Sequence, residues 1–197
     1  MPLTATKLAG SGSPDGRVPY DYYATNPKAV YDLYYKHHFT GTKVLEPCVG
    51  EGHIAKVVKR LLPESEITTL DIVDRGYPGT IVTDFLEWET DETFDLIITN
   101  PPFSCAQEFV QKGMSLLTEN GQMMMFLKIQ FLESERRREL FNIFPPKYIY
   151  VFSSRMGTWR NGEELDPKTG KQRVTTMCHA WFIWEQGFRG EPVVRWI

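Results

Sequence analysis

The sequence predicts an α/β fold in which a doubly wound, mainly parallel sheet carries helices on both faces. Short apolar runs of strand character alternate with segments whose apolar residues recur at helical spacing. The length of 197 residues suits one domain with a full core and is too short for two. In sheets of this kind ligands bind beyond the carboxyl ends of the strands, so functional residues are expected there.

The predicted elements follow one another along the chain. Strands are expected over 42–50, 66–72, 80–85, 94–100 and 122–129, and three late strands over 147–154, 178–185 and 192–197. Helices are expected over 53–62, over 105–121 with Gly121 as the terminating residue, and over 133–144 before Pro145. Residues 1–19 are rich in Gly, Ser and Pro, which predicts a flexible lead-in before a domain over 20–197.

Composition narrows the function classes only moderately. The net charge is −3, yet residues 147–197 carry +3 and residues 1–146 carry −6, a distribution that is compatible with a polyanionic partner. No stretch approaches the roughly 18 apolar residues of a membrane span. Cys48, Cys105 and Cys178 show no metal-binding or disulfide spacing, so no metal is expected and a reducing, cytoplasmic setting is the simpler interpretation.

Polar signals stand at the ends of the first three expected strands. Gly50 and Gly52 in "LEPCVGEG" allow a tight turn that approaches a ligand closely. Asp71 follows Gly50 by 21 residues, where a carboxylate can accept hydrogen bonds from both hydroxyls of a ribose. Asp84 and Phe85 offer an acceptor and a ring face that suit adenine. Each signal alone also fits an ordinary turn.

The fourth strand end, "NPPF", separates the possible chemistries. Pro101 and Pro102 fix the backbone after Asn100, so the Asn100 side-chain carbonyl and the Pro101 backbone carbonyl become two rigid acceptors. Two such acceptors suit an exocyclic amine, which has two N–H groups to donate. They polarise the amine and free its lone pair for attack, while Phe103 offers a face on which the ring that bears the amine can stack.

In this order "ATNP" (24–27), "LEPCVGEG" (45–52), "LDI" (70–72), "TDF" (83–85) and "NPPF" (100–103) resemble the amino-methyltransferase branch of the S-adenosylmethionine-dependent enzymes. The resemblance is closest to the small phage- or prophage-type N6-adenine DNA methyltransferases. It implies a Rossmann-like class I methyltransferase fold and methyl transfer from S-adenosyl-L-methionine to the N6 amine of adenine in DNA. Family members often have Thr-Pro in the first motif, whereas Asn26 intervenes here.

The resemblance also implies the roles of individual residues. The catalytic residues would be Asn100, Pro101, Pro102 and Phe103. The cofactor would be held by Thr25, Pro27, Glu46, Pro47, Gly50, Gly52, Asp71, Ile72, Asp84 and Phe85. Two other interpretations stay open: methylation of another amine (guanine N2 of RNA, cytosine N4 of DNA or a protein glutamine), or a non-catalytic subunit that binds the cofactor.

Residues 153–176 are the candidate substrate-recognition insertion, because the chain has no room for a separate recognition domain. The segment is polar, holds five basic side chains and Trp159, and is too long for an ordinary strand connection. A solvated hairpin without function is the other interpretation. Nucleic-acid contact is expected from Arg155, Trp159, Arg160, Lys171 and Arg173. The basic run 136–138 is expected to be a solvated helix face, and the oligomeric state is left open.

Overall fold

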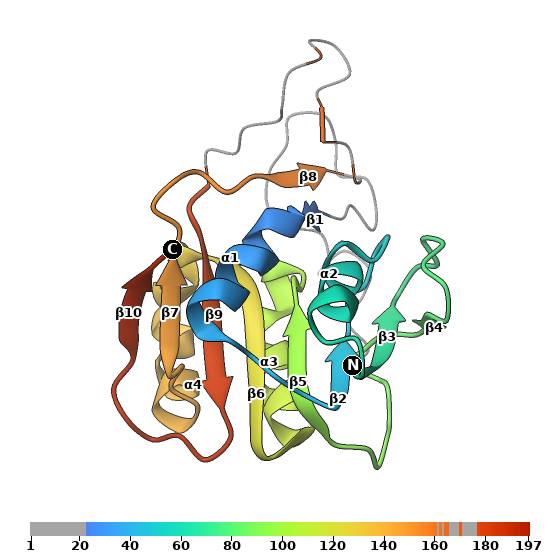
Figure 1. Ribbon diagram of the computed structural model, residues 1–197. Coiled ribbons are helices and arrows are strands. Elements are labelled where there is room, and N and C mark those ends of the chain that lie inside the picture. Colours follow the sequence, from blue (N-terminus) through green and yellow to red (C-terminus); the bar gives the residue numbers. More distant parts are fainter. Residues whose placement is uncertain (1–22, 161, 163, 166–169, 171–176) are drawn as a thin grey trace.

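The computed structural model describes residues 23–160, 162, 164, 165, 170 and 177–197 (Figure 1). Its main sheet has the strand order β10-β7-β9-β6-β5-β2-β3-β4. The strands are β2 (Lys43–Glu46), β3 (Glu66–Asp71), β4 (Ile81–Val82), β5 (Phe94–Thr99), β6 (Leu117–Lys128), β7 (Tyr148–Val151), β9 (His179–Glu185) and β10 (Val193–Trp196).

Strands β4, β3, β2, β5 and β6 are mutually parallel, β9 runs antiparallel between β6 and β7, and β10 is parallel to β7. This confirms the predicted mainly parallel sheet. The carboxyl ends of the parallel strands and the first residue of β9 therefore lie at one edge, uppermost in Figure 1, which we call the carboxyl edge. The opposite edge, where β2, β5 and β6 begin, is called the amino edge.

Helices cover both faces of this sheet, as a doubly wound fold requires (Figure 1). On one face α1 (Pro27–His37) and α2 (His53–Leu61) bury their apolar sides, including Leu33, Ile54 and Val58, against the sheet. On the other face α3 (Ala106–Ser115) and α4 (Arg138–Ile143) do the same through Phe109 and Leu140. The described residues also form the 3-10 turns η2 (Phe103–Cys105), η3 (Ile129–Leu132) and η4 (Glu135–Arg137).

Helix α1 and a small two-stranded ribbon were not anticipated from the sequence. The Asn26 side chain caps α1 by accepting a hydrogen bond of 2.9 Å from the Lys28 backbone N–H, and Pro27 occupies the first turn. The residue that interrupts the Thr-Pro pattern therefore has a structural role. Before it, β1 (Tyr23–Thr25) pairs antiparallel with β8 (Thr158–Arg160), and this ribbon lies over the carboxyl edge (Figure 1).

Several predicted boundaries were wrong. The helix expected over 105–121 is α3, which ends at Ser115 instead of Gly121. It ends early because β6 already pairs with β5 from Leu117 onward, opposite Phe94. Gly121 lies inside β6, where a Cβ atom would stand 2.8 Å from the Phe94 carbonyl oxygen. The expected strand over 80–85 contains only Ile81–Val82, and the expected helix over 133–144 is split between η4 and α4. None of the described helices is both long and apolar enough to cross a membrane. The lead-in over 1–19 lies outside the described residues.

Candidate active site

The turn between β2 and α2 is built on two glycines in left-handed conformations. Gly50 has a φ of 53° and Gly52 a φ of 80°, values that residues with a Cβ atom rarely adopt. A Cβ atom on Gly52 would also collide with the ring of Tyr77, from the β3–β4 connection, which packs directly on the turn. The backbone of this loop is therefore available for close contact at the carboxyl edge.

Asp71, the last residue of β3, fastens this glycine loop. One carboxylate oxygen accepts a hydrogen bond of 2.8 Å from the Gly50 N–H, and the other accepts one of 3.0 Å from the Val73 N–H. The side chain is 8% exposed. A carboxylate has about four acceptor positions, so two remain for a ligand. A role in holding ribose hydroxyls stays a prediction.

Glu46 ends β2 with a carboxylate that is 1% exposed. The backbone N–H of Ala55 lies near the carboxylate and opposes the rise in its pKa, but Oε2 has no hydrogen-bond partner among the described residues. Burial raises the pKa of Glu46 well above its usual range, and the neighbouring Asp71 adds to that rise. Burying a carboxylate oxygen without a donor is costly, so this site favours a ligand that brings one.

The Asn100 side chain follows β5 and is oriented by a contact that the sequence does not reveal. Its Nδ2 donates a hydrogen bond of 2.7 Å to the backbone carbonyl of Tyr23. Because a backbone carbonyl can only accept, the amide nitrogen must face Tyr23, and the carbonyl Oδ1 faces the other way. Pro102 holds extended backbone, with φ −57° and ψ 125°, and Phe103 begins the turn η2 with its ring half-buried.

Polar atoms that are buried without a hydrogen bond gather at the same edge. Among the described residues they include Thr25 Oγ1, Glu46 Oε2 and His179 Nδ1, which stand at the end of β1, the end of β2 and the start of β9. Thr99 Oγ1, at the end of β5, also lacks a hydrogen-bond partner among the described residues, although it lies near the weakly polar thiol of Cys48. Folded proteins leave few such atoms unpaired, so their concentration at one edge is the mark of a binding site for a polar ligand.

The remaining predicted cofactor residues lie around this edge in different environments. Ile72, just beyond β3, is 39% exposed, whereas the Phe85 ring is 2% exposed and packs in the core 4.8 Å from the ring of Phe109. Asp84 accepts a hydrogen bond of 2.9 Å from the Leu86 N–H within its own turn. Pro47 follows Glu46 directly, and Pro27 begins α1.

The predicted nucleic-acid residues are brought together only in part. Trp159 lies in β8, with its ring 5.6 Å from that of His53 at the start of α2, so it stands beside the glycine loop. Arg155 donates to the Cys178 sulfur at 3.4 Å. The backbone of Arg160 belongs to β8, while Lys171 and Arg173 lie outside the described residues.

Two residues near Phe103 were missed by the sequence reasoning. The ammonium of Lys128, the last residue of β6, lies 4.6 Å from the Phe103 ring centre, and the His179 ring lies 6.2 Å from it. Lys128 could have been found from the rule that located Asp71 and Asn100, because it lies one residue before the end of the strand predicted over 122–129. His179 could not, since its strand was not known to run antiparallel.

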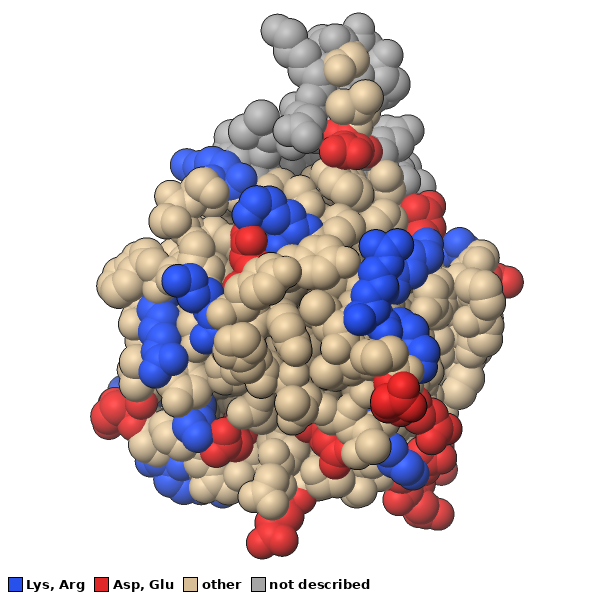
Figure 2. Space-filling model, in the orientation of Figure 1, with Lys and Arg blue, Asp and Glu red and all other residues tan. Residues whose placement is uncertain are grey.

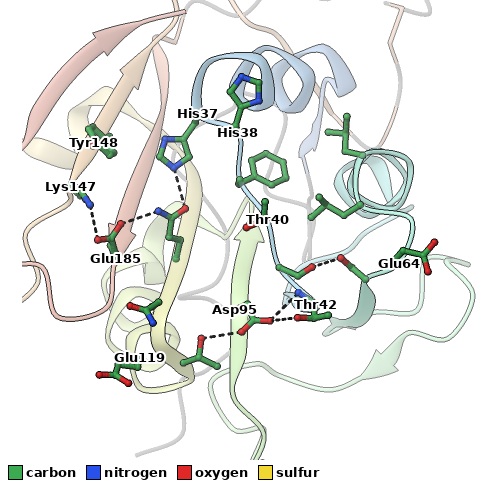
Figure 3. Close-up of a pocket in the computed structure, with 18 of the residues that line it drawn as sticks. His37, His38, Thr40, Thr42, Glu64, Asp95, Glu119, Lys147, Tyr148 and Glu185 are labelled. Atoms are coloured by element: carbon green, nitrogen blue, oxygen red, sulfur yellow. Dashed lines mark hydrogen bonds and ion pairs between the residues drawn. The ribbon is translucent and has the colours of Figure 1, made fainter.

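A cavity of about 990 Å³ lies at the amino edge, away from these strand ends (Figure 3). Its polar groups pair with one another: His37 Nε2 and the Gln122 carbonyl are 3.2 Å apart, Gln122 donates to Glu185 at 3.0 Å, and Lys147 donates to Glu185 at 2.6 Å. Asp95 accepts from both the backbone and the hydroxyl of Thr42. No group of metal-binding side chains occurs in the described part of the chain.

This fold is that of the class I S-adenosylmethionine-dependent methyltransferases. A putative member from Listeria monocytogenes superposes with a TM-score of 0.62 at 12% identity, over 88% of this chain and 64% of that one. A modification subunit of a putative type I restriction enzyme from Vibrio vulnificus also gives 0.62, at 16% identity, over 89% of this chain and 47% of that one.

In sequence, 87 residues are 34% identical to the type II methyltransferase M.CvrRI of Paramecium bursaria Chlorella virus XZ-6E. The match covers 39% of this chain and 23% of the viral protein, so it spans less than a quarter of that relative's length. No protein-family model matches the chain.

Proposed function

We propose that this protein transfers a methyl group from S-adenosyl-L-methionine to the N6 amine of adenine in DNA. The observation that carries the proposal is the orientation of Asn100, whose side-chain nitrogen is held by the Tyr23 carbonyl so that Oδ1 is left as an acceptor beside Pro101. Methylation of a planar amine requires an acceptor of this kind. It stands at the same edge as the glycine loop and the unpaired buried atoms.

The residues of the carboxyl edge fit the proposed cofactor. S-adenosyl-L-methionine supplies, when bound, an electrophilic methyl group on a positively charged sulfur. Glu46 Oε2 is a buried acceptor that suits the ammonium group of a methionine moiety. The unused acceptor positions of Asp71 suit ribose hydroxyls, and Ile72 offers an exposed apolar surface for an adenine ring.

Asn100 and Pro101 would then prepare the substrate amine for attack. Asn100 Oδ1 accepts one N–H and the Pro101 carbonyl accepts the other. Both hydrogen bonds draw nitrogen toward tetrahedral geometry and free its lone pair, so no titrating base is needed before attack. Nitrogen would form its bond to the methyl group as the methyl–sulfur bond breaks, and the surplus proton on nitrogen would then pass to solvent. In duplex DNA the base must leave the stack to reach these acceptors, which costs a few kcal/mol that stacking on Phe103 offsets.

The choice of DNA as substrate rests on the relatives. The viral relative is named a type II methyltransferase, and the Vibrio vulnificus protein is named a modification subunit of a putative type I restriction enzyme. Both names are compatible with a DNA substrate. The basic net charge of residues 147–197 and the position of Trp159 beside the glycine loop also support a polyanion near the site.

The deciding experiment supplies the full chain with methyl-labelled S-adenosyl-L-methionine and separate pools of single- and double-stranded DNA, RNA and protein. We expect label in DNA, recovered as N6-methyladenine after digestion to nucleosides. Label in N4-methylcytosine, N2-methylguanosine or methylglutamine would replace the proposed substrate with another amine. Titration calorimetry that detects NAD binding and no binding of S-adenosyl-L-methionine would overturn the cofactor as well.

A further inference from the structure

Lys128 and His179 form a small polar cluster beside Phe103 to which the proposed reaction assigns no role. Lys128 ends β6 and His179 begins β9, and the two residues are directly opposite each other in the antiparallel ladder. Directly opposed residues place their Cβ atoms roughly 4.5–5.5 Å apart on the same face of the sheet. Both side chains therefore lie next to the Phe103 ring.

The Lys128 ammonium has donors to spare. It lies 4.6 Å from the centre of the Phe103 ring, and no carboxylate pairs with it among the described residues. Loss of solvent lowers the pKa of Lys128, which is half-buried. The aromatic face is thus occupied by a cation that would gain from a true acceptor.

His179 offers an acceptor that nothing uses. The side chain is 4% exposed and its ring stacks on Phe126, with centres 4.8 Å apart. The backbone carbonyl of Met156 lies near the ring, and Nδ1 has no hydrogen-bond partner within the described structure. Burial lowers the pKa of His179 to about 4, so the ring is neutral near pH 7 and one of its two nitrogens keeps a lone pair that can accept a hydrogen bond.

Resting on the proposed function, we propose that Lys128, positioned by His179, is the residue that holds the ring of the target base. When the base stacks on Phe103 it displaces the Lys128 ammonium from that face. Lys128 then donates one hydrogen bond to His179 Nδ1 and another to a ring nitrogen of the base. Adenine suits this arrangement because acceptors, N1 and N7, flank its amine on both sides, so the amine can face Asn100 while a ring nitrogen faces Lys128.

The test uses a single-stranded oligonucleotide with one adenine and three matched versions, in which that adenine is 1-deazaadenine, 7-deazaadenine or an abasic site. Binding is measured by fluorescence anisotropy with S-adenosylhomocysteine present, and KM and kcat are measured by methylation. The variants are Lys128→Met, Lys128→Arg and His179→Phe, which keeps an aromatic ring on Phe126. Lys36→Met, an exposed lysine at the far end of α1, is the control.

We expect Lys128→Met to raise KM for the adenine oligonucleotide by about 10- to 150-fold, the range for a hydrogen bond to a charged group. Cofactor affinity should be unchanged. One of the two deaza oligonucleotides should bind the wild type more weakly than the adenine oligonucleotide does. Lys128→Met should bind that deaza oligonucleotide and the adenine oligonucleotide equally well. Lys128→Arg should retain part of the affinity, and His179→Phe should raise KM with a smaller change in kcat.

Two results would overturn the inference. One is a KM of Lys128→Met that equals the KM of the wild type. The other is an equal loss of affinity of Lys128→Met for the adenine and abasic oligonucleotides, which would indicate that the ammonium contacts a phosphate. A wild-type protein that methylates no adenine in any oligonucleotide is a separate failure, of the proposed function itself.

Discussion

The two edges of the sheet differ in how completely they satisfy their own polar groups. At the amino edge, Asp95 accepts four hydrogen bonds, from two groups of Thr42, from the Lys43 N–H and from the Thr118 hydroxyl. Gln122 links His37 to Glu185, and Lys147 neutralises that carboxylate. At the carboxyl edge, Thr25, Glu46 and His179 each bury an atom that has no partner among the described residues.

This difference in hydrogen-bond satisfaction identifies the functional site better than cavity volume does. The cavity of about 990 Å³ lies at the amino edge, where the polar groups are already paired and acidic side chains are numerous (Figures 2 and 3). Figure 2 shows Asp and Glu gathered mostly along the lower part of the molecule, below the blue cluster of Lys and Arg over α2. An edge that leaves buried acceptors unpaired forgoes stability, which is typical of a site that binds a ligand.

The largest difference between the edges should appear in activity. Asn100→Ala removes the oriented acceptor, and we expect a loss of kcat of about 100-fold or more, the range for removing one preorganised polar group from an active site. Cofactor affinity should change little. The matched control is Asn120→Ala, an exposed asparagine at the amino edge, which should keep full activity. Comparable turnover by Asn100→Ala and the wild type would remove the proposed mechanism.

Cofactor affinity gives the next largest effect. Asp71→Ala deletes the acceptor of the Gly50 and Val73 N–H groups and the proposed ribose contact. Charge-assisted hydrogen bonds are worth about 1.5–3 kcal/mol, so binding of S-adenosyl-L-methionine should weaken by roughly 10- to 150-fold in titration calorimetry. Asp71→Asn keeps the shape and one acceptor and should lose less. Equal affinities of wild type and Asp71→Ala would separate Asp71 from the cofactor.

At the amino edge the expected effect falls on stability alone. Asp95→Ala should lower the free energy of unfolding by about 1–3 kcal/mol, the cost of leaving donors unpaired, while specific activity stays normal. Hydrogen bonds from the Lys43 N–H, chiefly, and from Thr42 lower the pKa of Asp95 below its ordinary value of 3.8. The contribution of Asp95 to the free energy of unfolding is therefore present above pH 3.8 and is lost as pH falls through the folded pKa. The free energies of unfolding of Asp95→Ala and the wild type, measured in urea, should converge in acid. A variant that is stable but inactive would contradict the assignment of the two edges.

The smallest expected effect has the opposite sign. Burial raises the folded pKa of Glu46 above the ordinary 4.5, so the wild type loses stability as pH rises from that value toward the folded pKa. Glu46→Gln removes this loss and should stabilise the free protein near pH 8 by about 0.5–2 kcal/mol, while weakening cofactor binding. Thermal melting with and without S-adenosylhomocysteine measures both. A destabilised free variant would show that Glu46 is a structural residue.

Local features of the site could be predicted from the sequence because their causes are local. The glycine turn, Asp71 at the end of β3 and the extended backbone after Asn100 each depend on residues only a few positions apart. Helix α2 followed from apolar spacing in the same way. The end of α3 did not, because strand pairing with β5, remote in the sequence, outweighed a helical pattern that continued past Ser115.

The sequence by itself thus determined the class of fold, the order of its motifs and the strand ends that carry them. Only the tertiary structure decided which way the Asn100 amide faces, because its partner Tyr23 is 77 residues away. It also decided which buried atoms lack partners and that His179 stands opposite Lys128. Periodicity and proline geometry act over a few residues, whereas hydrogen-bond satisfaction is settled only when distant segments of the chain pack together.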